Sequence, residues 1–106
     1  MSALGWSPPE PTDARAALRR LAGEDPIAAR GQIVSCLCDR LGPSLGRLDG
    51  AVVTPCLLAT VLSELAYESW LWVMGDRTWE HFAEALAGRL GRRIAAFGPK
   101  NATAGS

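Results

Sequence analysis

Apolar residues recur at helical spacing through most of the chain between positions 12 and 98. The longest such stripe lies between positions 79 and 97 and consists of Trp79, Phe82, Ala83, Leu86, Leu90, Ile94 and Phe97. No segment shows the strict alternation of apolar and polar residues that is typical of a half-buried strand. The pattern therefore predicts an all-α fold, a single-domain bundle of four helices.

Capping and helix-breaking residues bound the first two predicted helices. Thr12 or Asp13 can cap the first helix, which should end near Gly23. The second helix opens with Asp25 as its N-cap and Pro26 at its first position, where a proline removes no helical hydrogen bond. It should end at positions 42 and 43, where a proline follows a glycine.

The third predicted helix has the clearest start in the chain. Thr54 is its N-cap, Pro55 occupies its first position, and Gly75 ends it. It is apolar on most of its circumference, which predicts that other helices surround it. Its length would allow it to cross a bilayer, but Glu64 and Glu68 near its middle would each cost about 2.5–3.5 kcal/mol there. We therefore expect a largely buried helix and no transmembrane segment.

The fourth predicted helix begins at Asp76 or Thr78 and ends at the Gly-Pro pair of positions 98 and 99. Small side chains recur along it at every fourth position and indicate a close crossing of another backbone, either within the chain or across a dimer seam. These residues are Ala83, Ala87, Gly91 and Ala95, with Gly88 beside them. The third and fourth helices should supply the centre of the core, namely Leu58, Val61, Leu62, Leu65, Trp72, Trp79, Phe82, Leu86 and Leu90.

Both ends of the chain are predicted to be disordered, which leaves a helical domain at residues 12–98. Residues 1–11 contain three prolines and a glycine, and these interrupt both helices and ladders. Residues 99–106 are mostly small and polar and show no periodicity. A chain of 106 residues is long enough for one hydrophobic core and too short for two.

Charge and cysteine content narrow the classes of function. Eleven basic residues balance eleven acidic ones, so no overall field attracts nucleic acid or an anionic membrane. Three cysteines, with no signal-peptide pattern in the first residues, predict a reduced, cytoplasmic setting. Cys36 and Cys38 point to different sides of a helix, so they cannot hold one zinc ion as a loop pair does.

Candidate catalytic chemistry is sparse. His81 is the only histidine, and a solvated helix face explains it and the nearby Glu80 and Glu84 better than a metal site does. Cys56 lies in the first turn of a helix, where the dipole favours a thiolate, but no histidine is near it in the sequence. We expect no catalytic, metal or cofactor site. An enzyme that uses Cys56 or His81 is the alternative.

Aromatic residues concentrate between positions 67 and 82, which hold three of the four tryptophans and the only tyrosine. The short turn after Gly75 makes the third and fourth helices neighbours and brings Trp70, Trp72 and Trp79 to one end of the pair. Large aromatic side chains commonly fill the core of a small domain. However, the side chains from Trp70 to position 73 point in four directions, so at least one apolar residue should be exposed as an interface anchor.

The spacing of some of these residues resembles a family signature. Trp72 and Val73, followed after five residues by Trp-Glu-His-Phe at 79–82, have the Trp-aliphatic-x5-Trp-acid-x-Phe spacing. This spacing is similar to the second homology segment of the B-cell-lymphoma-type apoptosis regulators. Further upstream, Gly-Gln-Ile-Val at 31–34 resembles the Gly-Arg-Ile-Val core of that family's first homology segment. The resemblance covers residues 31–82.

The resemblance implies a groove that accepts the amphipathic helix of a partner protein. Gly31 would line this groove, and Trp79 and Phe82 would brace its end. The sequence departs from the family at Arg30, where the family has a tryptophan, and at Gln32, where the family has its partner-binding arginine.

These patterns favour recognition over catalysis. We predict a small, non-enzymatic interaction or regulatory protein that binds a partner helix, or a second copy of itself, at its aromatic helix junction. The predicted partner-binding residues are Gly31, Trp70, Leu71, Trp72, Trp79 and Phe82. The alternative is a nucleic-acid-binding regulator that uses the basic end of the fourth helix, which carries Arg89, Arg92 and Arg93.

Overall fold

The computed structural model describes residues 6–45, 47–48 and 51–105, with side chains placed over 6–45 and 53–96. The described residues form five α-helices and one antiparallel pair of two-residue strands. In chain order these are α1 (Thr12–Glu24), α2 (Pro26–Leu45), β1 (Arg47–Leu48), β2 (Ala51–Val52), α3 (Pro55–Glu64), α4 (Ala66–Met74) and α5 (Trp79–Gly105). The all-α prediction is confirmed. The strand pair was not anticipated, and it is too short to change the class.

The predicted third helix is two helices, so the expected bundle of four becomes five. The helix is interrupted at Leu65, whose φ of −104° and ψ of 24° depart from helical values. Its N–H still bonds to the carbonyl oxygens of Val61 and Leu62. A segment that is apolar on most of its circumference needs neighbours on several sides. The bend provides them, because α3 contacts α2 and α5 whereas α4 also contacts α1.

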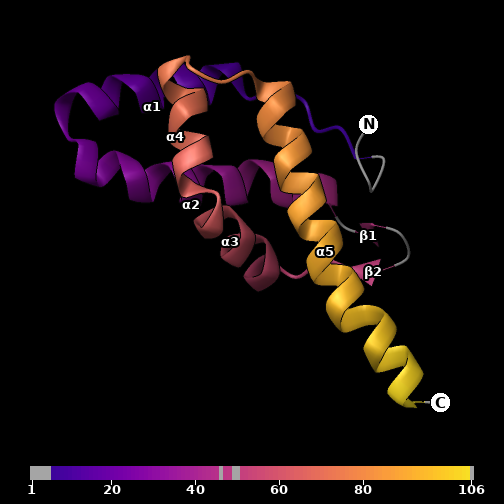
Figure 1. Cartoon of the computed structure of the whole chain (residues 1–106). Helices are drawn as coiled ribbons and strands as arrows, with labels where there is room; N and C mark the ends of the chain where they lie inside the picture. Colours follow the sequence, from indigo (N-terminus) through magenta and orange to yellow (C-terminus); the bar gives the residue numbers. More distant parts are fainter. Residues whose placement is uncertain (1–5, 46, 49–50, 106) are drawn as a thin grey trace.

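The helices are arranged around α4. In Figure 1, α1 and α2 run in opposite directions as a hairpin, and α3 and α4 lie across them. α5 returns alongside α3 and α4, and its C-terminal half extends beyond the other helices. α4 contacts α1, α2, α3 and α5, which confirms that the apolar segment is surrounded. The predicted core residues of α3, α4 and α5, together with Leu65 between α3 and α4, are all buried.

Three of the predicted helix starts are confirmed. The side chains of Asp25, Thr54 and Thr78 each accept a hydrogen bond from the backbone N–H three residues later, at 3.1, 3.1 and 3.2 Å. The start of α1 differs, because its N-cap is Pro11 and no side chain caps it. Asp13 instead pairs with Arg40 of α2 at 2.6 Å. The Asp13 carboxylate, which was predicted as a possible cap, therefore forms a long-range ion pair and does not cap the helix.

Two helices run past their predicted ends. α2 continues through Pro43 to Leu45, and α5 continues through Pro99 to Gly105. A proline in a helix removes one backbone hydrogen bond, and in α5 the carbonyl left free belongs to Ala95, which is exposed to water. In α2, burial of Leu45 favours the extra turn. The tail predicted to be disordered from residue 99 is thus helical to Gly105, and residue 106 lies outside the described residues.

Only the first half of the row of small residues on α5 lies at an intrachain crossing, because Gly91 is half-buried and Ala95 is exposed. Ala83 and Ala87 are buried where α5 contacts α3 and α4. Gly88 does not need to be small, because a Cβ placed on it would meet nothing within 4 Å. The interpretation that a close backbone approach requires Gly88 is therefore wrong.

The N-terminal segment, residues 6–11, is packed against the helices. Trp6, Pro8 and Pro11 are buried, and hydrogen bonds join this segment to α2, α4 and α5. The prediction of a disordered tail is therefore wrong for residues 6–11. Indole N–H groups of the helices donate hydrogen bonds to Pro8 and Glu10, and the indole of Trp6 donates one to Ser44 of α2. Residues 1–5 lie outside the described part of the chain.

Candidate partner-binding surface

The aromatic helix junction has a buried half. Trp72 of α4 and Trp79 and Phe82 of α5 are only 1%, 4% and 0% exposed. The ring centroids of Trp72 and Trp79 are 4.9 Å apart, and those of Trp79 and Phe82 are 5.4 Å apart. Gly75, with a φ of 87°, makes the tight turn that brings α4 and α5 together. The rings of these three aromatic residues are packed in the core, so the prediction that they form the contact surface for a partner helix is wrong for them.

The exposed half of the junction lies on the opposite side of α4. Ser69, Trp72 and Val73 form the buried face of this helix. The residues at i, i+3, i+4 and i+7 on the other side define what we call the outer face of α4: Tyr67, Trp70, Leu71 and Met74. Tyr67 is 68% exposed, and the other three are half-buried. The predicted Trp70 and Leu71 are therefore accessible, while Tyr67 and Met74 were missed although their helical spacing was a usable signal.

The first turns of α2 carry further exposed residues. Ile27 is 83% exposed, and Arg30 and Gly31 are exposed beside it. Ile27 does not belong to the buried face of α2, which passes through Ala29 and Ile33. A Cβ on Gly31 would meet nothing within 4 Å, so this predicted residue is accessible and leaves room for a partner.

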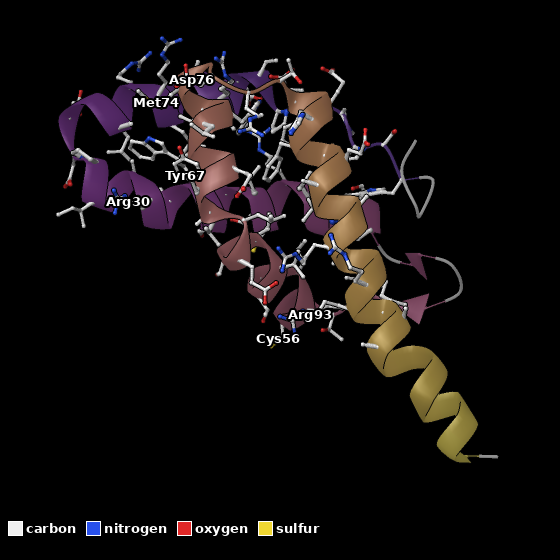
Figure 2. The ribbon with its side chains drawn as sticks, viewed as in Figure 1. Arg30, Cys56, Tyr67, Met74, Asp76 and Arg93 are labelled. Atoms are coloured by element: carbon white, nitrogen blue, oxygen red, sulfur yellow. The ribbon has the colours of Figure 1, made fainter. Side chains whose placement is uncertain are left out.

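A pocket of about 340 Å³ lies where α2 and α4 meet. Its lining consists of Arg30, Ile33, Ala66, Tyr67 and Trp70. The guanidinium carbon of Arg30 lies 5.8 Å from the ring centroid of Trp70, within the range of a cation–π contact. Figure 2 shows Arg30, Tyr67 and Met74 on the side of the molecule away from α5. Within the described residues, Arg30 forms no ion pair with a carboxylate.

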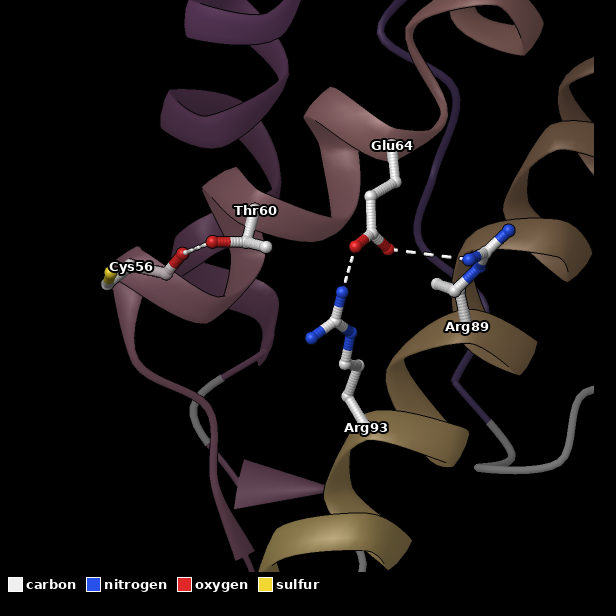
Figure 3. Close-up of polar contacts among 5 residues, drawn as sticks. All are labelled: Cys56, Thr60, Glu64, Arg89 and Arg93. Atoms are coloured by element: carbon white, nitrogen blue, oxygen red, sulfur yellow. Dashed lines mark hydrogen bonds and ion pairs between the residues drawn. The ribbon is translucent and has the colours of Figure 1, made fainter.

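The basic end of α5 is engaged in structure. Glu64 of α3 pairs with Arg89 at 3.5 Å and more closely with Arg93, as Figure 3 shows. Arg92 is exposed and has no such pair among the described side chains. Two of the three arginines predicted for nucleic-acid binding thus pair with a carboxylate of the same chain.

The remaining chemical groups are scattered. The Nη1 group of Arg77 donates to Nε2 of His81 at 2.8 Å, which occupies one ring nitrogen of the only histidine. Among the described residues, no group of three acidic, histidine or cysteine side chains could hold a metal ion. Partial burial raises the pKa of the Cys36 and Cys38 thiols, whereas Cys56 is exposed.

Comparison with protein-family models, curated proteins and solved structures finds no match. No helix in the described part of the chain combines the length and the apolar character needed to cross a membrane. The apoptosis-regulator resemblance of residues 31–82 stays a prediction.

Proposed function

We propose that this protein is a non-enzymatic interaction protein that binds an amphipathic helix of another protein on the outer face of α4. The observation that carries the proposal is a row of apolar side chains, one exposed and three half-buried, on a helix whose other side is packed in the core. Apolar residues at i, i+3, i+4 and i+7 match the contact stripe of an incoming helix. The three free cysteines of this protein fit a reducing, cytoplasmic setting.

The pocket between α2 and α4 indicates what the partner helix carries. Its volume of about 340 Å³ suits a large apolar side chain, which would rest against Trp70 and Tyr67 as an anchor. Arg30 at the rim has no carboxylate partner within the described residues, so an acidic residue one turn from the anchor would complete an ion pair. The expected ligand is therefore a short helix with an apolar stripe and an aspartate or glutamate beside it.

The size of the surface favours a short helix over a second copy. α4 has 9 residues and is therefore about 13 Å long. A stable homodimer commonly buries about 800 Å² on each partner, which exceeds what one face of so short a helix offers. A partner helix lying in the angle between α2 and α4 can use both elements at once.

This binding mode is also the one that the B-cell-lymphoma-type resemblance implies. Gly31 is accessible on α2, as a groove residue would be. Trp79 and Phe82 support the junction from within the core and do not contact the partner. A role in apoptosis regulation stays a prediction of that resemblance.

A charge-swap experiment tests the proposal. The probe is a labelled synthetic helix with leucines at i, i+3 and i+7 and an aspartate one turn from the central leucine, followed by fluorescence anisotropy. We expect Trp70→Ala and Leu71→Ala each to weaken binding by about tenfold. Arg30→Glu should weaken binding of this probe by a similar factor. The same variant should bind well to a second probe that has lysine in place of aspartate.

Leu57→Ala is the matched control, because Leu57 is a half-buried leucine on α3, away from this surface. It should leave binding unchanged. Correctly folded Trp70→Ala and Leu71→Ala proteins that bind as well as the wild type would overturn the proposal, as would a wild type that binds neither probe at about millimolar concentration. A dimer in sedimentation that Trp70→Ala dissociates would assign the surface to a second copy instead.

A further inference from the structure

Two buried indoles hold the N-terminal segment, residues 6–11, in place. Nε1 of Trp79 donates a hydrogen bond of 2.8 Å to the carbonyl oxygen of Pro8. Nε1 of Trp72 donates one of 3.0 Å to the carboxylate of Glu10. Both tryptophans belong to helices, and their rings pack against each other and against Phe82, so contacts within the helical core orient their donors. The two indoles therefore form a prepared site on which this segment lies.

The segment itself is constrained by proline. Prolines stand at positions 8, 9 and 11, and the residue before each proline is biased toward extended conformations. At one end, Nε1 of Trp6 donates to the hydroxyl of Ser44 at 3.4 Å. At the other end, the N–H of Thr12 donates to the carbonyl oxygen of Glu10 across a tight turn at Pro11. Residues 6–11 thus resemble a bound proline-rich peptide that is continuous with the chain.

The space around the segment is larger than the segment fills. One cavity of about 390 Å³ separates it from the first turns of α5, where Glu80, Ala83 and Glu84 contribute to the lining. A second cavity of about 330 Å³ lies between Glu10, Arg15 and the turn after Gly75. Trp79 lines both cavities. We call this region, formed by Trp72, Trp79 and the two cavities, the indole trough.

We propose that the indole trough is a binding site for extended peptides of the pattern Pro-Pro-acid-Pro, occupied in this chain by its own residues 6–11. Prolines restrict a peptide before it binds, so little conformational entropy is lost on binding. Proline-rich peptides are recognised in grooves lined by aromatic residues. Here the indole of Trp79 also donates a hydrogen bond to the carbonyl oxygen of Pro8. A second indole donor for the carboxylate adds the preference for an acidic residue.

The tethered segment competes with any peptide from another protein. A short flexible tether gives an effective concentration in the millimolar range, so a free peptide gains access mainly when the tethered contacts are weakened. The indole trough and the outer face of α4 lie on opposite sides of α4, so this inference does not depend on the proposed helix-binding function.

The test uses the full chain and a labelled synthetic peptide with the sequence of residues 5–13. The double variant Trp6→Ala with Glu10→Ala weakens the tethered segment and leaves both trough indoles intact. We expect it to bind the peptide about tenfold more tightly than the wild type does. Adding Trp79→Phe, which keeps a ring but removes the N–H donor, should reverse this gain. A peptide with alanine at positions 8 and 9 is the matched control and should not bind.

The proposal would be overturned if the double variant had a native circular dichroism spectrum but did not bind the peptide at about millimolar concentration. It would also be overturned if adding Trp79→Phe to the double variant left the affinity unchanged. If the double variant does not fold, the wild type is titrated with several-millimolar peptide while the indole N–H resonance of Trp79 is followed. A shift with the proline peptide and none with the alanine peptide supports the trough. No shift, or the same shift with both, rules it out.

Discussion

The indole N–H of Trp79 donates its hydrogen bond to the carbonyl oxygen of Pro8, a residue 71 positions earlier in the chain. This contact joins the start of α5 to a segment that precedes the first helix. It lies next to the stacked rings of Trp72 and Phe82, so the aromatic core and the N-terminal segment form one packed unit. The stability of each should therefore depend on the other.

Trp79→Phe should destabilise the protein by about 1–3 kcal/mol. The change removes a buried donor, leaves the Pro8 carbonyl without its partner and opens a small gap where the larger ring was. Urea unfolding would measure the loss, and hydrogen exchange should show faster exchange at the first turns of α1. Trp70→Phe is the control, because Trp70 is half-exposed and makes no hydrogen bond through its indole among the described contacts. Equal losses for the two variants would contradict this argument.

Glu64→Gln should cost about 0.5–1 kcal/mol at low salt. Glu64 accepts from both Arg89 and Arg93, so one neutralised carboxylate leaves two adjacent guanidinium groups unpaired. Partly exposed pairs of this kind each contribute only a few tenths of a kcal/mol and are screened by salt. The difference between wild type and variant in urea unfolding should therefore shrink as sodium chloride is added.

Arg92→Gln is the matched control for the Glu64 experiment. Arg92 lies on the same helix but is exposed and has no ion pair among the described residues. Its loss should change the free energy of unfolding little at any salt concentration. A difference for Glu64→Gln that persists undiminished in high salt would show that the contact stabilises through packing and not through charge.

The Asp13–Arg40 pair predicts a specific response to pH. The hydrogen bond from Arg40 lowers the pKa of the Asp13 carboxyl below its usual value. Because the folded-state pKa is the lower one, the pair stabilises the fold above the unfolded-state pKa and loses this effect as pH falls through the folded-state value. Arg40→Gln should raise the pKa of Asp13, measured by NMR titration of its carboxyl carbon, and its destabilisation should vanish in acid.

Arg20→Gln provides the comparison for that titration, because Arg20 is exposed on α1 and forms no ion pair within the described part of the chain. It should leave the pKa of Asp13 nearly unchanged. A pKa that moves equally in both variants would mean that the general positive charge of the region, and not the contact with Arg40, sets its value.

Local signals predicted most of the helical architecture. The caps at Asp25 and Thr54 act within three residues. The 3.6-residue stripe on α5 identified its buried face as far as Leu90, whereas Ile94 is half-buried and the side chain of Phe97 lies outside the described residues. The break at Leu65 could not be predicted in this way, because no glycine or proline marks it. It arises from the need of an apolar segment to contact α1 as well as α2 and α5.

Contacts between distant parts of the chain were the main source of error. Residues 6–11 have a composition typical of a mobile tail, but the indoles of Trp72 and Trp79, more than sixty positions away, bind the segment and help to fix it in place. The candidate surface also depends on contacts between distant parts of the chain. The sequence showed that Trp70 to Val73 cannot all be buried, but only the packing of α4 decides that Trp70 and Leu71 are outside while Trp72 is inside.

Two glycine substitutions should change stability in opposite directions. Gly88→Ala should stabilise the protein by about 0.5–1 kcal/mol, since glycine disfavours a helix interior and the new methyl group meets no other atom within 4 Å. Gly75→Ala should destabilise it by about 1–2 kcal/mol, because φ is 87° there and the new Cβ lies 3.0 Å from the side chain of Arg15. Thermal unfolding of both variants beside the wild type would measure the two effects. A loss of stability in Gly88→Ala would mean that another chain or segment approaches α5 at this point, which would restore the dimer seam as an explanation for its small residues.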